Sequence, residues 1–182
     1  MRNLSILVLA LVACGPPSAN PAPEPEQASE MIRVPVGTTM ATAAQINTIK
    51  PTAIHVAKPL NQVWLQMSTV YDSLGVPLNT IDPTTHTIGN GDLEARRRIG
   101  GAALRDYLNC GNTQGGSNTD TYEVRMSVLS KLAADPSGGT TITTTVQAMG
   151  RPISTAGEYL RCSSTGSLEL RIGEAAKARS GG

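Results

Sequence analysis

The sequence predicts an α+β domain in which an antiparallel sheet packs on one main amphipathic helix, at about residues 59–74, with a short C-terminal helix. Three features support this fold class. One segment repeats apolar residues at the spacing of a helix face, and two long segments alternate apolar with polar residues, as half-buried strands do. The chain is also rich in threonine and glycine, which suit strands and tight turns. Phenylalanine is absent, so we expect a core of Val, Leu, Ile, Met and Ala.

The main helix is predicted from a stripe of apolar residues along one of its faces. The stripe comprises Leu60, Val63, Trp64, Met67, Val70, Tyr71 and Leu74. Pro59 suits the first helical position, and Gly75 suits the residue just past the helix end. Since Trp64 lies in the middle of the stripe, we expect it to be buried against the sheet.

Strands are predicted before and after this helix in the sequence. Residues 32–36 alternate in polarity, and Pro35 restricts that strand to a sheet edge. Residues 37–50 fit either another short strand or irregular chain. A further strand follows Pro51, and it turns His55 away from the face that its two neighbours share.

After the helix, residues 78–82 and 86–90 fit two short strands, and Asn90-Gly91 then signals a turn. Residues 94–99 fit a further strand.

The strongest strand prediction is an antiparallel hairpin. Residues 122–128 and 142–148 alternate cleanly in polarity, and residues 135–139 between them have the composition of a turn. Residues 159–163 fit a last short strand. Residues 168–176 fit either a strand or a helix, and we prefer the helix.

The N-terminus has the features of an export signal. Residues 1–3 carry a positive charge, and residues 4–13 form an apolar run much shorter than the roughly 20 residues of a membrane span. The stretch Leu11-Val12-Ala13-Cys14 resembles the lipobox of bacterial lipoproteins. The resemblance implies cleavage before Cys14, a diacylglycerol thioether on its sulfur and acylation (for example with palmitate) of its new amine.

The resemblance also implies a location. Gly15, and not Asp, follows Cys14, which favours the outer membrane, with the domain facing the periplasm. Residues 15–30 are rich in proline and are expected to form an extended tether, which at ~3.1 Å per residue reaches about 50 Å; the alternative is a proline-rich recognition peptide. The predicted organisation is therefore a signal peptide (1–13), a lipidated cysteine with its tether (14–30) and a single α+β domain (31–180).

A second resemblance concerns the domain. The strand, helix, turn and strand over residues 54–90, with the pair Val63-Trp64 near the helix start, resemble the domains of BamC-type envelope lipoproteins. That resemblance implies a helix-grip arrangement, in which a curved antiparallel sheet wraps a helix. The arginine row, the Asn109-Cys110-Gly111 turn and residues 162–169 are similar to uncharacterised envelope lipoproteins of environmental bacteria, which bring no known activity.

Two cysteines remain once Cys14 is assigned to lipid. Cys110 and Cys162, an even pair in an exported domain, predict a disulfide. Closing a loop of this length stabilises the fold by roughly 4 kcal/mol in the chain-entropy model. A redox pair is the alternative, although the Cys-x-x-Cys spacing is missing.

The remaining motifs argue against several functions. The formal charge is +1, and loss of Arg2 with the signal peptide brings it to about zero, which argues against nucleic-acid binding. His55 and His86 have no zinc-like spacing, and neither a nucleophile elbow nor a phosphate loop is present. We therefore expect no metal, no cofactor, no catalytic residue and no enzymatic activity.

Two surface features remain as candidate contacts. On a strand, Arg96 and Arg98 would share a face, with Arg97 opposite. They form either a solvated edge that discourages aggregation or an anion site for lipid headgroups, peptidoglycan or an acidic patch on a partner. The loop 109–120 supplies amides of the kind that bind sugars, or is a polar loop held by Cys110.

These features together predict an outer-membrane lipoprotein that faces the periplasm. We expect a non-enzymatic binding or scaffold module in envelope assembly or maintenance, attached to the membrane through lipid on Cys14 and acting through contacts with envelope proteins. The alternative is a carrier of a small ligand or glycan that uses the space between sheet and helix. An enzyme is a third hypothesis, for which the sequence names no residues.

Overall fold

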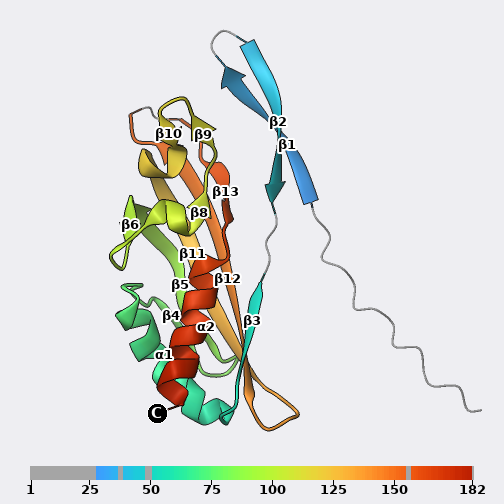
Figure 1. The fold of residues 1–182 in the computed structure, drawn as a ribbon, viewed down its shortest axis with the longest axis vertical. Helices are drawn as coiled ribbons and strands as arrows, with labels where there is room; N and C mark the ends of the chain where they lie inside the picture. The colour runs from blue at the N-terminus through green and yellow to red at the C-terminus, as the bar shows by residue number, and fades with distance from the viewer. Residues whose placement is uncertain (1–27, 37–38, 48–50, 155–156, 182) are drawn as a thin grey trace, which may run out of the picture.

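The computed structural model describes residues 28–36, 39–47, 51–154 and 157–181. Within them, two helices lie against one antiparallel sheet, which confirms the predicted α+β class (Figure 1). The helices are α1 (Leu60–Ser73) and α2 (Ser167–Ser180). The two helices have the same length, so the expectation of one main helix and a short second one is wrong. The signal peptide, Cys14 and the tether up to residue 27 lie outside the described residues.

The main sheet has nine strands, and all its pairs are antiparallel. Its hydrogen-bonded order is β7-β6-β5-β11-β12-β13-β8, with β4 added beside β5 and β3 beside β12. The strands are β3 (Thr52–Val56), β4 (Thr80–Asp82), β5 (Thr87–Arg96), β6 (Arg98–Ile99), β7 (Ala102–Ala103), β8 (Leu108–Asn109), β11 (Tyr122–Ala134), β12 (Thr140–Pro152) and β13 (Leu160–Ser164).

Smaller elements complete the described chain. Two short 3-10 turns, η1 (Leu104–Asp106) and η2 (Asn118–Asp120), flank the cysteine loop. That loop contains a small hairpin of β9 (Asn112–Thr113) and β10 (Gly116–Ser117).

A separate hairpin pairs β1 (Ala28–Val36) with β2 (Thr39–Asn47). It confirms the strand predicted at residues 32–36 and decides the ambiguous segment 37–50 in favour of a strand over Thr39–Asn47.

The central hairpin of β11 and β12 has one covered face and one open face. The strands pair from Tyr122 opposite Pro152 to Ala134 opposite Thr140, as the alternating pattern predicted. Alternate residues of both strands are buried, among them Val124, Val128, Leu132, Ile142 and Val146. The residues between them point to the opposite face and are exposed or half-buried.

Both helices cover the buried face. The helix α1 packs on β5 and β11, α2 packs on β3 and β12, and the helices contact each other. The buried residues of α1 are Val63, Met67, Val70 and Tyr71, and those of α2 include Leu168, Ile172 and Ala176. On α2, a Cβ added at Gly173 would lie 2.3 Å from Cγ1 of Ile54 on β3, so only glycine allows this close approach. Side chains therefore fill the space between sheet and helices.

Trp64 differs from its prediction. It is half-buried at the rim of the core, with its ring edge-on to His86 at a centroid distance of 5.5 Å. Val63 and Met67 are fully buried at the centre of the α1 face, and Trp64 packs at its side.

The turn predicted at Asn90-Gly91 is a β-bulge inside β5. Asn90 pairs with Val128 and Leu93 with Met126, so that two residues of β5 oppose the single residue Ser127. The buried amide of Asn90 stabilises the bulge, because its nitrogen donates to the Pro77 carbonyl at 2.7 Å and its oxygen accepts from the backbone N–H of Asp92 at 2.9 Å. The same residue types serve bulges and turns, since both need locally irregular backbone.

The strand predicted at residues 94–99 is also interrupted. β5 ends at Arg96, Arg97 adopts a positive φ of 60°, and β6 begins at Arg98, which pairs back with Arg96. The reversal follows from packing: a Cβ at Gly100 would lie 1.8 Å from the Leu74 carbonyl oxygen, so the loop rests directly on the end of α1.

Candidate functional site

Cys110 and Cys162 form a disulfide, as predicted. It joins the segment after β8 to β13 across 52 residues, and both cysteines are buried. Because buried sulfurs are poorly placed for exchange with another thiol, the bond has the properties of a structural link.

The arginine row is folded into a tight turn. Arg96 and Arg98 face each other on adjacent strands. Arg96 Nη2 donates to Glu123 Oε2 at 3.2 Å, while Arg98 donates to the Gly101 carbonyl. The two guanidiniums are therefore held by different partners.

Further charged groups extend from Glu123 across the open face. The same carboxylate lies 3.6 Å from Arg151 Nη2, and the Arg151 guanidinium lies 4.7 Å from the centre of the Tyr159 ring. Arg125 lies 5.5 Å from that ring and donates to Glu94 at 2.7 Å. The hydrogen bond to Glu94 raises the pKa of Arg125 above its ordinary value. Positive and negative groups thus alternate across three strands.

Beside this charged row, the open face contains a hollow of about 480 Å³ that crosses β5, β11, β12 and β13. We call it the trough. One row of its lining residues is Asp92, Ser127, Gln147 and Ser163, and a second row is Arg125, Met149 and Arg161. Pairing places Ser127 opposite Gln147, and it places Met149 between Arg125 and Arg161.

The sequence shows why the face is hollow here. The bulge opposite Ser127 bends β5, the first row has small side chains at Ser127 and Ser163, and Gly91 beside it has none. The second row has the long side chains of Arg125, Met149 and Arg161. In addition, β13 pairs with β12 only from Ala148 to Gly150 and then turns to β8, so the two strands separate at the end of the trough.

The loop 109–120, predicted as a source of sugar-binding amides, uses two of those amides internally. Asn109 Oδ1 accepts from the Gly111 N–H at 2.9 Å, and Asn118 Nδ2 donates to the Cys110 carbonyl at 3.2 Å. Asn112 and Gln114 are exposed. None of these residues lines the trough.

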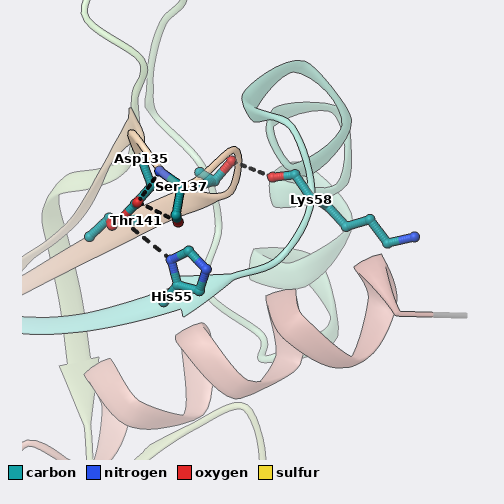
Figure 2. A network of polar contacts seen from close by, with 6 residues as sticks. His55, Lys58, Asp135, Ser137 and Thr141 are labelled. Carbon is teal, nitrogen blue, oxygen red and sulfur yellow. Dashed lines mark hydrogen bonds and ion pairs between the residues drawn. The ribbon is translucent and has the colours of Figure 1, made fainter.

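His55 belongs to a polar network at the β11–β12 turn (Figure 2). Its Nδ1 lies 3.5 Å from Asp135 Oδ2, and Asp135 also accepts from the Ser137 hydroxyl at 2.6 Å and from the Thr141 hydroxyl at 3.3 Å. The Ser137 hydroxyl and backbone N–H, with smaller contributions from Thr141 and His55, lower the pKa of Asp135.

This network lacks the geometry of a nucleophile. A serine is activated when its hydroxyl meets a base such as imidazole, which a carboxylate then orients. Here the carboxylate lies between the serine and the imidazole, so the network holds the turn together. Within the described ranges, no three His, Cys, Asp or Glu side chains are grouped to hold a metal ion.

Glu169, on the first turn of α2, is a buried carboxyl that the sequence did not reveal. It is 1% exposed. Its Oε1 accepts from the Ser164 hydroxyl at 2.6 Å, and its Oε2 has no partner. Burial raises the pKa of this carboxyl. Ser164 also lines the end of the trough, so the carboxyl is one hydrogen bond away from it.

Comparison of the chain with protein-family models and with curated proteins finds no match. Over the part of the chain that the structure describes, no helix has both the length and the apolar character needed to cross a lipid bilayer.

Proposed function

We propose that this chain is a bacterial outer-membrane lipoprotein, anchored through lipid on Cys14, whose domain is a non-enzymatic binding module in envelope assembly or maintenance. The lipobox stretch 11–14 and the proline-rich tether support the anchor. The disulfide supports export, since such bonds persist in oxidising compartments. The packing of both helices on one face of a sheet supports a helix-grip-like domain.

The trough is the observation on which the binding role depends. One face of the sheet is occupied by helices, and the opposite face carries a hollow of about 480 Å³ lined by exposed polar side chains together with apolar residues. Ligand sites are concave and combine apolar surface with a few placed polar groups. The open face is therefore the surface that we assign to binding.

Site-specific photo-crosslinking tests this assignment. A benzophenone residue at position 147, on the outward side of β12, is expected to capture an envelope component in cells that express the full lipidated chain. The control places the same residue at position 177, an exposed residue of α2. Equal capture at both positions, or at neither, would contradict the assignment.

Two further arms separate the parts of the proposal. Cys14→Ser is expected to release the protein from the membrane fraction and to abolish labelling with radioactive palmitate.

Arg96→Ala/Arg98→Ala tests the arginine turn as an anion or partner contact. Since both guanidiniums already have partners and lie outside the trough, we expect capture at position 147 to persist in this variant. Loss of capture would assign the arginine turn to the binding surface.

A second candidate function, the carrier of a small ligand or glycan, is supported by the size of the trough. The sequence placed such a ligand between sheet and helix, but that space is filled by side chains such as Met67, Tyr71 and Ile172, all fully buried. The proposed carrier site is therefore the open face.

A further inference from the structure

The shape of the trough limits what can bind there. It crosses four neighbouring strands, and strands lie about 4.8 Å apart, so it is about 14 Å long and runs across the strand direction. An extended peptide joins a sheet by pairing with a free strand edge. On the face of the sheet, the backbone groups of β11 are already paired on both sides with β5 and β12. A ligand in the trough must therefore bind through side chains.

The lining combines small and apolar residues with four side chains that end in planar polar groups. Gln147 offers an amide, Asp92 a carboxylate, and Arg125 and Arg161 offer guanidiniums. Each presents paired donors or acceptors, which match neighbouring hydroxyls and acetamido groups of a sugar. Met149, which is 45% exposed, provides an apolar surface for a ring face or an acetyl methyl. This chemistry disfavours a purely apolar ligand.

Opposite charges lie at the two ends of the trough. Asp92 lies on β5 at one end of the trough, and Arg161 lies on β13 at the other. Arg125 is already bonded to Glu94. Arg161 already takes part in contacts of its own, and a guanidinium, with five N–H donors, can serve more than one acceptor. A ligand with hydroxyls at one end and a carboxylate at the other fits this arrangement.

We infer that the trough binds a short sugar chain bearing N-acetyl groups and a carboxylate, with the carboxylate at Arg161 and the acetamido and hydroxyl groups at Gln147 and Asp92. The inference rests on the proposed function, because it names the ligand of the same site. In the envelope, this chemistry occurs in the glycan strands of the cell wall.

The test is calorimetric titration of the full lipidated protein in detergent micelles with two disaccharides. One is N-acetylglucosaminyl-N-acetylmuramic acid, and the other, di-N-acetylchitobiose, lacks the carboxylate. We expect saturable binding of the acidic sugar and about tenfold weaker binding of the neutral one, the difference that a charge-assisted hydrogen bond provides. Arg161→Gln is expected to remove the difference, and Gln147→Ala to weaken both sugars.

Thr143→Ala is the matched control. Thr143 lies on the same outward side of β12 as Gln147 but outside the trough, so its loss is expected to change neither affinity. Thermal unfolding of each variant verifies that it is folded.

Binding of neither sugar, or equal binding of both that Arg161→Gln leaves unchanged, would overturn the inference. If position 147 still captures an envelope component in that case, the binding module stands and only its ligand is wrong.

Discussion

Single buried polar groups make the stability of this domain depend on pH. Glu169 is the clearest, since its Oε2 is buried without a partner and burial raises its pKa. The folded state therefore favours the protonated acid. The stability that protonated Glu169 contributes is complete below its pKa in the unfolded chain, about 4.3. It is lost as the pH rises through the higher pKa of the folded state.

Glu169→Gln is expected to stabilise the protein at about pH 8, because the neutral amide avoids burying the charge of an ionised carboxylate. The amide oxygen can still accept from Ser164. At about pH 4 the variant and the wild type are expected to unfold at similar urea concentrations, because most of the carboxyl is then protonated. A stabilisation of the same size at both pH values would show that charge burial is not the cause.

The buried hydroxyl of Tyr71 makes stability depend on pH in the alkaline range. Its hydroxyl is bonded to Ser130 Oγ at 2.8 Å, and Ser130 Oγ to Thr144 Oγ1 at 2.8 Å. Burial raises the pKa of Tyr71 to about 12, so stability is lost as the pH rises from the unfolded value of about 10 through about 12.

Tyr71→Phe is expected to cost about 1 kcal/mol at neutral pH, from the lost hydrogen bond, and to flatten the alkaline decrease. Urea unfolding between about pH 8 and about pH 11 measures both effects against wild type. An unchanged alkaline decrease would show that ionisation of Tyr71 is not its cause.

Local periodicity in the sequence was sufficient to predict some structural elements and insufficient for others. The helix α1 and the hairpin of β11 and β12 were predicted because each contains its own repeating pattern and its own boundary signals. The bulge beside Asn90 and the reversal at Arg97 depend instead on contacts with residues distant in sequence, Pro77 and the end of α1. No local pattern contains those contacts.

Gly100→Ala tests the contact between the arginine turn and α1. Gly100 has a φ of +52°, and a Cβ would meet the Leu74 carbonyl. We expect a loss of unfolding free energy of at least about 1–3 kcal/mol, the cost of a strained backbone residue, with additional cost from the clash.

Gly101→Ala is the control. Gly101 also has a positive φ, +81°, but a Cβ there would meet nothing within 4 Å. It therefore carries the backbone strain without the clash, and denaturant titration should find it less harmful than Gly100→Ala. Equal losses in the two variants would exclude the close approach to α1 as a cause.

For the whole molecule, the candidate site arises from strands far apart in the chain. Asp92, Arg125, Gln147 and Arg161 come together only through the order β5-β11-β12-β13 and the registers between those strands. The sequence showed that the side chains between the buried ones are polar, but it could not show which of them are neighbours. It predicted Arg96 and Arg98 as contacts because alternate residues of a strand share a face, and it predicted the disulfide because only two cysteines remained.

The disulfide links this site to global stability. It fixes the middle of β13, next to Arg161, to the segment after β8, and Cys162 itself borders the trough.

Cys110→Ser/Cys162→Ser is expected to lower the unfolding free energy by about 4 kcal/mol in the chain-entropy model, a large part of the 5–15 kcal/mol typical of a domain. Urea unfolding of the variant, compared with wild type with and without reductant, measures the loss.

If the bond only restricts the unfolded chain, the folded variant keeps the affinity of the trough for its sugar. If it also positions β13, affinity decreases even where the variant is fully folded, and Arg161→Gln then has a smaller effect in the variant than in wild type. A variant with wild-type stability would contradict the predicted role of the bond.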